Sequence, residues 1–259
     1  SPTARVLGGT KLQAEKSDNY SAGLVYHKGP FELTVDAYQI KIDDRIVLSE
    51  NIQGSPTGDA TARAIYALLQ PFGVSAARFF INGVSTTTKG VDVIARYRLD
   101  AEEAGRFDFT LAGNYNETEV TRVPTTSALS SLPVPPSLFA RVNVLTYEEG
   151  TPKKKAVFST DWNNGAWGAT LKASYYDSVL APQTNPALDY RTGNKEVFDL
   201  EARYSWHGAT LAVGANNLFD EYPNRTPAPV NTNGPIAFSS FSPFGFNGRF
   251  LYSRLSYSW

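Results

Sequence analysis

The chain contains no cysteine and no methionine, and it has almost no excess of either charge. Its 259 residues include 24 basic and 25 acidic side chains, which gives a formal net charge of −1. Without cysteine, the protein can form no disulfide scaffold, no thiolate zinc site and no thiol nucleophile. Because the chain is close to neutral, it also lacks the basic surface that binds nucleic acid. We therefore expect no nucleic-acid partner.

The sequence also lacks long hydrophobic runs. No apolar stretch approaches the roughly 20 residues that a membrane-spanning helix requires, and no signal peptide is recognisable. Within a bilayer, only helices and closed β-barrels satisfy their own backbone polar groups. If this chain spans a membrane, it must therefore do so as a β-barrel.

Residue patterns typical of catalytic or metal sites are scarce as well. His27 and His207 are the only histidines, and each lies close to a glycine at a predicted turn. The sequence has neither a His-Glu-x-x-His pair nor a Gly-x-Ser-x-Gly elbow. We expect both histidines to be solvated, and we predict no catalytic residue, no metal site, no cofactor and no enzymatic activity.

What the sequence does contain is regular alternation of apolar and polar side chains. In the last stretch, Leu251, Leu255, Tyr257 and Trp259 alternate with polar residues up to the final position. Side chains alternate across a strand, so this pattern predicts a strand with one apolar face. The segments of this kind that are long enough to span a bilayer are the nine at 20–27, 31–42, 86–99, 107–116, 156–162, 167–175, 198–206, 211–215 and 249–259.

The connections between these segments alternate between short and long. The short ones are 29–30, 100–105, 163–165 and 207–208, and the long ones are 50–84, 122–152, 181–194 and 218–246. An up-and-down meander places all the short turns at one end and all the long loops at the other. This asymmetry is typical of bacterial outer-membrane barrels. We therefore predict an all-β fold, a transmembrane antiparallel up-and-down β-barrel.

The two predicted faces of the strands differ in chemistry. One carries Asp, Glu, Lys and Arg, which a water-filled lumen tolerates, and the other is aliphatic with Tyr and Trp near strand ends. In segment 198–206 we expect Leu200, Ala202 and Tyr204 to face lipid, and Asp199, Glu201 and Arg203 to face the lumen. Alternation alone also fits a soluble β-sandwich or propeller, and that alternative stays open.

Two of the long connections contain signs of local structure. Asp59 is a suitable helix N-cap, and Pro71 with Gly73 would end the helix. The apolar residues at helical spacing between them are Ile65, Leu68, Leu69 and Phe72. In the connection 122–152, segment 138–146 is a candidate for one further short strand.

Several short motifs together resemble the C-terminal barrel portion of TonB-dependent outer-membrane receptors. Residues 216–222, Asn-Asn-Leu-Phe-Asp-Glu-Tyr, resemble the family's Asn-Leu-Phe-Asp…Tyr signature before the last extracellular loop. The terminal strand is similar to the family's, although Trp259 stands where Phe is more common. Residues 12–24, 88–92 and 151–153 are similar to motifs with which strands of the family start. In the first of them, Ala14 stands where the family usually has Pro. Together the motifs extend over nearly the whole chain.

The resemblance carries implications for architecture, location and partners. Such receptors form a barrel of about 22 strands around an N-terminal plug, and the plug engages the energy-coupling protein TonB. Nine strands cannot make that barrel, so we expect residues 1–259 to be its C-terminal part, with the plug domain absent from this chain. A smaller closed barrel remains an alternative if segments taken as loop are strands.

As implied by the resemblance, the expected function is energy-coupled uptake of a scarce small-molecule ligand across the cell outer membrane. Siderophores, haem, cobalamin and carbohydrates are all ligands of the family. A passive porin-like barrel and a soluble β-rich binding domain are the alternatives. The expected partners are outer-membrane lipid, lipopolysaccharide and TonB, and residues 153–155, three lysines in a row, are a candidate contact to lipopolysaccharide.

A Phe-rich stretch at 234–246 is the candidate ligand-binding loop. It exposes an unusual amount of apolar area for a loop. We predict that Phe238, Phe241 and Phe244 contact ligand, with polar contacts from Tyr190 and Arg191. The alternative is that the rings only pack against neighbouring loops. The resemblance further implies that the terminal aromatic marks the chain for outer-membrane assembly, and we assign this role to Leu255, Tyr257 and Trp259.

Overall fold

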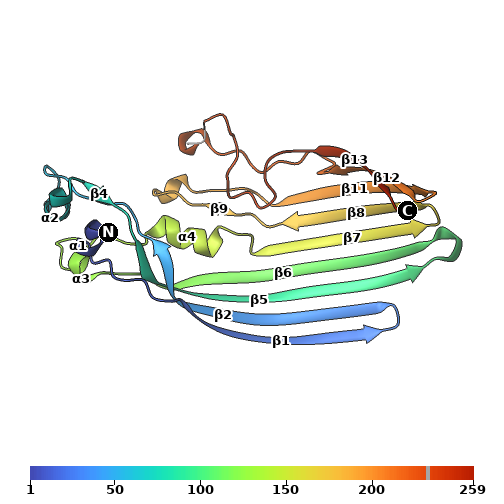
Figure 1. The fold of residues 1–259 in the computed structure, drawn as a ribbon, viewed down its shortest axis with the longest axis horizontal. Coiled ribbons are helices and arrows are strands. Elements are labelled where there is room, and N and C mark those ends of the chain that lie inside the picture. The colour runs from blue at the N-terminus through green and yellow to red at the C-terminus, as the bar shows by residue number, and fades with distance from the viewer. Residues whose placement is uncertain (232–233) are drawn as a thin grey trace. The chain divides into compact units, whose positions relative to one another are not determined.

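The structure, a computed structural model, describes residues 1–231 and 234–259 (Figure 1). By its internal contacts, the chain divides into two compact units. Unit 1 comprises Ser1–Tyr20, Gln39–Thr88 and Thr118–Glu148, and unit 2 comprises Ser21–Tyr38, Lys89–Glu117 and Glu149–Trp259. No helix among the described residues has the length and the apolar character to cross a membrane.

The dominant element is a nine-stranded sheet in which neighbours along the chain are also neighbours in space. Its strands are β1 (Lys16–Lys28), β2 (Phe31–Leu48), β5 (Phe80–Asp100), β6 (Arg106–Arg122), β7 (Lys154–Asn164), β8 (Trp167–Tyr176), β11 (Lys195–Trp206), β12 (Ala209–Asn216) and β13 (Phe250–Tyr257). The pairs from β6 to β13 are antiparallel, and β1 and β13 form the two edges. This order confirms the predicted up-and-down meander of nine strands.

The short turns follow from residues that accept a left-handed backbone. Gly29 and Gly165 have φ values of 56° and 57°, which an L side chain rarely adopts. In the turn between β11 and β12, which is also two residues long, both His207 (φ 47°) and Gly208 (φ 81°) are left-handed. Such turns match the twist of the flanking strands and therefore join them with two residues. Both His27 and His207 are exposed, as expected.

In unit 2, the register places the two kinds of side chain on opposite faces of the sheet, as the alternation predicts. Across β11 and β8, Asp199 is paired with Lys172, and their side chains form an ion pair of 2.9 Å. The polar face of the sheet includes Asp161, Lys172, Asp199, Glu201, Arg203 and Arg254. The apolar face includes Phe158, Leu171, Leu200, Tyr204, Leu211 and Leu255. Leu200 and Tyr204 are 42% and 41% exposed although both are large and apolar.

A network of charges covers the polar face. The Arg203 guanidinium lies 2.9 Å from Asp161, and the Tyr252 hydroxyl donates to Glu201 at 2.9 Å. These groups come from β7, β11 and β13, so opposite charges link strands that are not all adjacent. The network explains why Asp199, Glu201 and Arg203 can share one face without like-charge repulsion.

Unit 1 has a conventional hydrophobic core. Its helices and short strands are α1 (Pro2–Val6), β3 (Ile52–Gln53), α2 (Ala60–Leu69), η1 (Gln70–Phe72), β4 (Ala76–Ala77), α3 (Ser127–Ser130) and most of α4 (Arg141–Glu149). The buried core consists of Leu7, Val47, Ile52, Ile65, Leu69, Phe79, Ile81, Val84, Leu129, Leu138 and Phe139. These residues come from three separate segments of the chain, so the long connections pack against one another rather than remaining open loops.

Helix α2 forms where the sequence predicts it. The Asp59 side chain accepts a hydrogen bond of 2.8 Å from the Ala62 backbone N–H, and Gly73 (φ 70°) ends the following turn. Ile65 and Leu69 are buried, as their spacing predicts. Phe72 lies in the following turn η1 and is 39% exposed, so it does not belong to the buried face of the helix.

The candidate strand at 138–146 is wrong, because these residues enter helix α4. The Glu50 carboxylate accepts hydrogen bonds from the Ala140 backbone N–H at 3.1 Å and from the Asn143 side chain at 2.6 Å. An anion that binds the free N–H groups at a helix start stabilises the helix. The extra strand that a smaller closed barrel needs is therefore missing from this connection.

Most strands extend beyond their predicted segments, and the boundaries of β5 and β13 are two examples of a difference. Strand β5 begins at Phe80, inside the predicted long connection 50–84. The terminal strand β13 ends at Tyr257, whose partner Ala209 is the first residue of β12. Ser258 still donates to the Gly208 carbonyl at 2.8 Å, but Trp259 lies outside the ladder because β12 offers it no partner.

The remaining irregular elements belong to unit 2. They are η2 (Glu102–Ala104), β9 (Leu180–Ala181), η3 (Pro186–Leu188), β10 (Tyr190–Arg191) and η4 (Ala228–Val230). Strands β9 and β10 pair with each other, so the predicted loop 181–194 contains a small hairpin-like sheet.

Candidate functional site

The motif at 216–222 forms a closed turn at the start of the last long loop. Asn217 adopts a left-handed backbone (φ 52°), and its side chain bonds twice to the backbone of Glu221, at 2.7 and 2.8 Å. The Asn217 backbone N–H donates to the Asp199 carboxylate at 2.8 Å. Asparagine tolerates this conformation and bonds its own backbone, which explains its use here. The motif fixes the loop to the end of β12.

The far end of the same loop is tied to this turn. The Asp220 carboxylate accepts a hydrogen bond of 2.8 Å from the Arg249 backbone N–H, just before β13. Gly248 lies so close to the Tyr222 hydroxyl that a Cβ at this position would overlap it. Partial desolvation and the neighbouring Asp220 raise the pKa of the Tyr222 hydroxyl above its ordinary value. Both ends of the loop are thus held together over the sheet.

The phenylalanines of the loop contact other rings. Phe238 stacks on Tyr222, with ring centroids 5.3 Å apart, and lies 6.2 Å from Phe246. Phe244 approaches Tyr176, at the end of β8, with centroids 5.5 Å apart. The rings are half-buried rather than fully exposed. Ring packing of this kind holds the loop in place and still leaves aromatic edges accessible.

A cavity of about 390 Å³ lies where this loop meets the polar face, and we call it the loop-side cavity. Its aromatic lining residues are Tyr176, Phe244, Phe246 and Phe250, and its charged ones are Lys172, Asp199 and Glu221. The charges are paired: Lys172 with Asp199 at 2.9 Å, and Glu221 with Lys195 at 2.6 Å.

One cation stands apart from these pairs. The Lys155 ammonium lies 5.1 Å from the centroid of the Tyr176 ring, and it forms no ion pair within the described part of the chain. A cation over an aromatic face is held by the ring quadrupole and remains available to an anion. Rings beside a free ammonium suit a ligand that combines an aromatic or apolar part with negative charge.

The structure separates the five residues that the sequence predicts as ligand contacts. Phe244 lines the loop-side cavity, whereas Phe238 and Phe241 do not. The Tyr190 hydroxyl lies 3.2 Å from that of Thr226, at the base of the loop that carries Phe238. Arg191 instead forms an ion pair with Glu149.

Sequence reasoning missed several lining residues of the cavity. Lys172 and Tyr176 belong to a strand that precedes the Phe-rich loop by dozens of residues, and only the fold brings them beneath it. Phe246 and Phe250 had a signal, because they continue the same run of aromatic residues toward β13.

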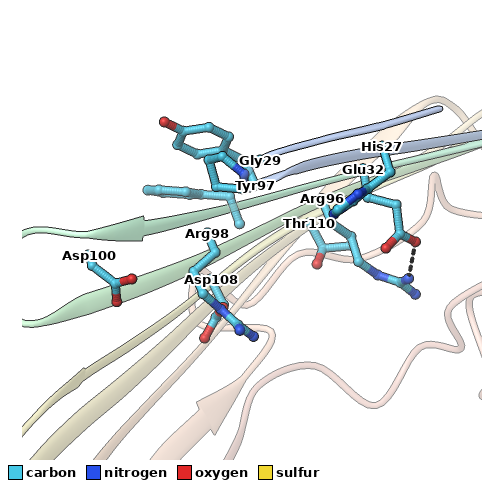
Figure 2. A pocket seen from close by; sticks show the side chains of 11 residues that line it. His27, Gly29, Glu32, Arg96, Tyr97, Arg98, Asp100, Asp108 and Thr110 are labelled. Atoms are coloured by element: carbon cyan, nitrogen blue, oxygen red, sulfur yellow. Dashed lines mark hydrogen bonds and ion pairs between the residues drawn. The ribbon is translucent and has the colours of Figure 1, made fainter.

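A second cavity of about 580 Å³ lies at the opposite strand ends, near the short turns, and we call it the turn-side cavity (Figure 2). Figure 2 shows Arg96 directed at Glu32, with 3.0 Å between guanidinium and carboxylate. Arg98 contacts Asp108 at 2.7 Å, and Asp108 also receives Arg106 at 3.1 Å.

Most of the charged side chains that line the turn-side cavity are paired with a neighbour of opposite charge. His27 lines it together with these pairs, but no group of three or more possible metal ligands occurs among the described residues. Tyr97 and Phe109 are its two aromatic lining residues, whereas the loop-side cavity has four. We therefore regard the loop-side cavity as the better candidate for ligand binding.

Comparison with known proteins identifies a family and several solved structures to which this chain is similar. The sequence matches the family described as "TonB dependent receptor-like, beta-barrel" over residues 1–218. No curated protein matches the chain. Among solved structures, it is similar to the copper transporter OprC (17% identity, TM-score 0.56), covering 96% of this chain and 32% of that one.

Two further structures share the fold. One is the FrpB iron transporter from Neisseria meningitidis (13% identity, TM-score 0.60), with 95% of this chain and 30% of that chain covered. The other is a mutant of the ferric enterobactin receptor PfeA from Pseudomonas aeruginosa (15% identity, TM-score 0.60), with 96% and 32% covered. The chain thus spans about a third of the length of these proteins. Because the family match extends over far more than half of its residues, this protein belongs to the family of TonB-dependent receptor β-barrels, which are outer-membrane proteins.

Proposed function

We propose that this chain forms the C-terminal barrel strands of an outer-membrane receptor that takes up a scarce ligand with energy delivered through TonB. In this proposal, a plug domain elsewhere in the receptor engages TonB. The observation that carries the proposal is the nine-strand meander with one charged and one exposed apolar face, together with the family match. An apolar face is stable in lipid, and a charged face is stable along a wet lumen.

The ligand class is an iron-siderophore, haem, cobalamin or a carbohydrate. The related structures are named as transporters or receptors for copper, iron and ferric enterobactin, which favours a metal or a metal complex. Within this class, the free Lys155 ammonium and the ring of Phe244 favour a ligand with an anionic and an aromatic part. Phe238, Phe241, Tyr190 and Arg191 contribute to capture from the loops around the cavity.

Uptake by cells tests this function. A strain that lacks the gene of the full receptor is compared with a complemented strain, and each takes up radiolabelled iron-siderophore, haem, cobalamin or oligosaccharide. We expect one ligand to enter with saturable kinetics, and its uptake to stop when TonB is deleted or the proton gradient is collapsed. A passive porin would instead give non-saturable uptake that survives both treatments, and that result would refute the proposal.

The role of the loop-side cavity has its own test in the same assay. Phe244→Ala and Lys155→Gln should each lower the affinity of intact cells for the ligand, by about tenfold for a lost ring contact. Phe80→Ala is the matched control, because this exposed ring lies in unit 1 and lines neither the loop-side nor the turn-side cavity. Unchanged affinity in both variants would show that the ligand binds elsewhere.

A further inference from the structure

Asparagine followed directly by glycine occurs at four places in this chain, 82–83, 164–165, 233–234 and 247–248. Glycine has no Cβ to shield its backbone nitrogen, so this nitrogen can attack the side-chain amide carbon of the preceding asparagine. The attack requires the asparagine side chain and backbone to rotate toward the glycine. Because the four pairs share the same local sequence, a difference in reactivity between them must come from the fold.

The first pair is held firmly in place. The Asn82 side-chain oxygen accepts a hydrogen bond of 2.8 Å from the Gln13 backbone N–H. Its side-chain nitrogen donates to the carbonyls of Gln13 at 2.9 Å and of Asp44 at 2.6 Å. The backbone of Asn82 also belongs to strand β5. The side-chain amide therefore cannot turn toward Gly83 until these bonds break.

The second pair is restrained mainly through its backbone. Asn164 is the last residue of β7 and pairs with Trp167 across the turn into β8. Its side-chain nitrogen donates to the Glu103 carbonyl at 2.9 Å. Closing a ring onto Gly165 requires Asn164 to leave the ladder as well as this bond. The pair at 233–234 lies partly outside the described residues.

The fourth pair has no comparable restraint. Asn247 is exposed and lies in the irregular segment that precedes β13. Its side chain forms no hydrogen bond with any residue that the structure describes. The Gly248 backbone N–H likewise has no acceptor among these residues. Both groups that would react are therefore free. Asn247 also lines the loop-side cavity.

We propose that Asn247 is a site of spontaneous deamidation. The Gly248 nitrogen attacks Cγ of Asn247, and a new C–N bond closes a cyclic imide. The proton that the Gly248 nitrogen gives up ends on the departing Nδ2, which leaves as ammonia. Water then adds to one carbonyl of the imide and opens the ring, which gives aspartate or isoaspartate. The water of the solvent is the only co-reactant.

Either product adds a negative charge to the loop-side cavity. The charged side chains that line it already form ion pairs, Lys172 with Asp199 at 2.9 Å and Glu221 with Lys195 at 2.6 Å. The new carboxylate therefore has no free counter-ion among the lining residues. It repels an anionic ligand in the same cavity, because charges this close are only partly screened by salt. This consequence, unlike the modification itself, rests on the proposed function.

Isoaspartate additionally lengthens the backbone at a crowded point. Its main chain runs through the former side chain and gains one methylene group just before Gly248. A Cβ on Gly248 would already overlap the Tyr222 hydroxyl. The next residue, Arg249, donates its backbone N–H to Asp220 at 2.8 Å. A longer backbone displaces both residues, so the modification loosens the contact that holds the two ends of the last loop together.

Ageing of the full-length receptor tests the proposal. Native receptor in detergent and receptor unfolded in guanidinium chloride are incubated in parallel at mildly alkaline pH and then digested at acidic pH. Fragment mass spectra assign the deamidation to each pair, because one tryptic peptide, 226–249, contains both position 233 and position 247. Native structure should slow Asn82 and Asn164 by at least about tenfold, since a hydrogen bond that must break first slows a reaction by roughly that factor. Asn247 should react in the native receptor within about threefold of its unfolded rate.

Isoaspartate distinguishes ring closure from direct hydrolysis of the amide, which yields only aspartate. An isoaspartate methyltransferase should therefore label residue 247 in aged wild-type receptor. Asn247→Gln is the matched control, because its longer side chain would have to close a larger ring and should stay unlabelled. Protection of Asn247 equal to that of Asn164 would overturn the proposal, and so would deamidation of Asn247 without isoaspartate.

The effect on the loop is measured by amide hydrogen exchange in fresh and aged receptor. Ageing should accelerate exchange at Arg249 in the wild type and leave it unchanged in Asn247→Gln. Unchanged exchange in receptor whose residue 247 is isoaspartate would refute the loosening of the loop.

The effect of the charge is measured in the uptake assay with Asn247→Asp, which adds the carboxylate without lengthening the backbone. The affinity of cells for an anionic ligand should fall by about fivefold at low salt and by less at high salt. Unchanged affinity would refute the electrostatic consequence. The mass spectra require no ligand, so they decide the modification site even if the proposed transport function fails.

Discussion

The two units of this protein treat the same kinds of side chain in opposite ways. In unit 1, Leu7 and Leu69 are fully buried in a core built from three chain segments. In unit 2, Leu24 and Leu255 are 66% and 74% exposed on a regular sheet. Burial of apolar area stabilises a protein only where water is the surrounding solvent. Unit 1 is therefore organised like a water-soluble domain, whereas the sheet of unit 2 is organised for a surrounding that is itself apolar.

The two units also differ in how they arrange their polar groups. Unit 2 collects its charges on one face, where Arg203, Asp161 and Glu201 neutralise one another. In unit 1, polar groups act locally on the backbone, as when Glu50 binds the start of α4. The four predictions below test the contrast, beginning with the largest expected effect.

The largest effect should come from the exposed aromatic end of the chain. Tyr257→Ser combined with Trp259→Ser should remove most of the correctly assembled receptor from the outer membrane. These side chains are 62% and 103% exposed, so their loss breaks few contacts within the chain. We therefore expect it to act on recognition by the assembly machinery. The measurement is the amount of heat-modifiable receptor in outer membranes, beside ligand binding normalised to that amount. Normal insertion with lost binding would contradict this role.

Replacing the core residue Leu69 should lower the stability of unit 1 far more than replacing an exposed leucine of unit 2. Leu69→Ala should lower the stability of unit 1 by about 2–5 kcal/mol, because it leaves a cavity in a packed core. The measurement is the urea concentration at which protease cleaves segment 50–79 of the full receptor. Leu24→Ala, at an exposed leucine of unit 2, is the control and should leave this concentration unchanged. Similar shifts in both variants would show that unit 1 has no core of its own.

On β11, the folding free energy that a substitution costs should depend on which face of the sheet the residue occupies. Ala202→Arg should cost about 2–4 kcal/mol if the residue lies near the bilayer midplane, because the charge would face lipid. Glu201→Gln should cost about 1 kcal/mol or less, since the amide can still accept the hydrogen bond from Tyr252. The measurement is a folding titration of the receptor into lipid vesicles. Equal costs at the two positions would refute the assignment of the faces.

The smallest effect should come from the cap of α2. Asp59→Ala should destabilise the helix by about 0.5–2 kcal/mol, because the Ala62 backbone N–H loses its acceptor. Asp59→Asn keeps an acceptor oxygen and should cost much less. The measurement is amide hydrogen exchange across residues 60–69 of the full receptor. If both variants exchange equally fast, the side-chain bond does not stabilise this helix.

Features that depend on neighbouring residues in the sequence could be predicted, and the candidate site could be predicted only in part. The strands, the turns at Gly29 and Gly165, and the capped helix after Asp59 all follow from local backbone preferences and from alternation. Phe244 was found because its loop is unusually aromatic. Its partner Tyr176, and the free ammonium of Lys155, come from strands that carry no local sign of a site.

By itself, the sequence determined that this protein is a two-faced meander, because the side-chain period of a strand repeats along the chain whatever surrounds it. The tertiary structure decided the features that depend on contacts between residues far apart in the sequence. Residues 141–146 of the candidate strand belong to helix α4, at whose start Glu50 binds Ala140 and Asn143. The register of β7 divides the three lysines at 153–155 between two faces. These outcomes depend on which strands and loops meet in space, and contacts between segments far apart in sequence exist only once the chain has folded.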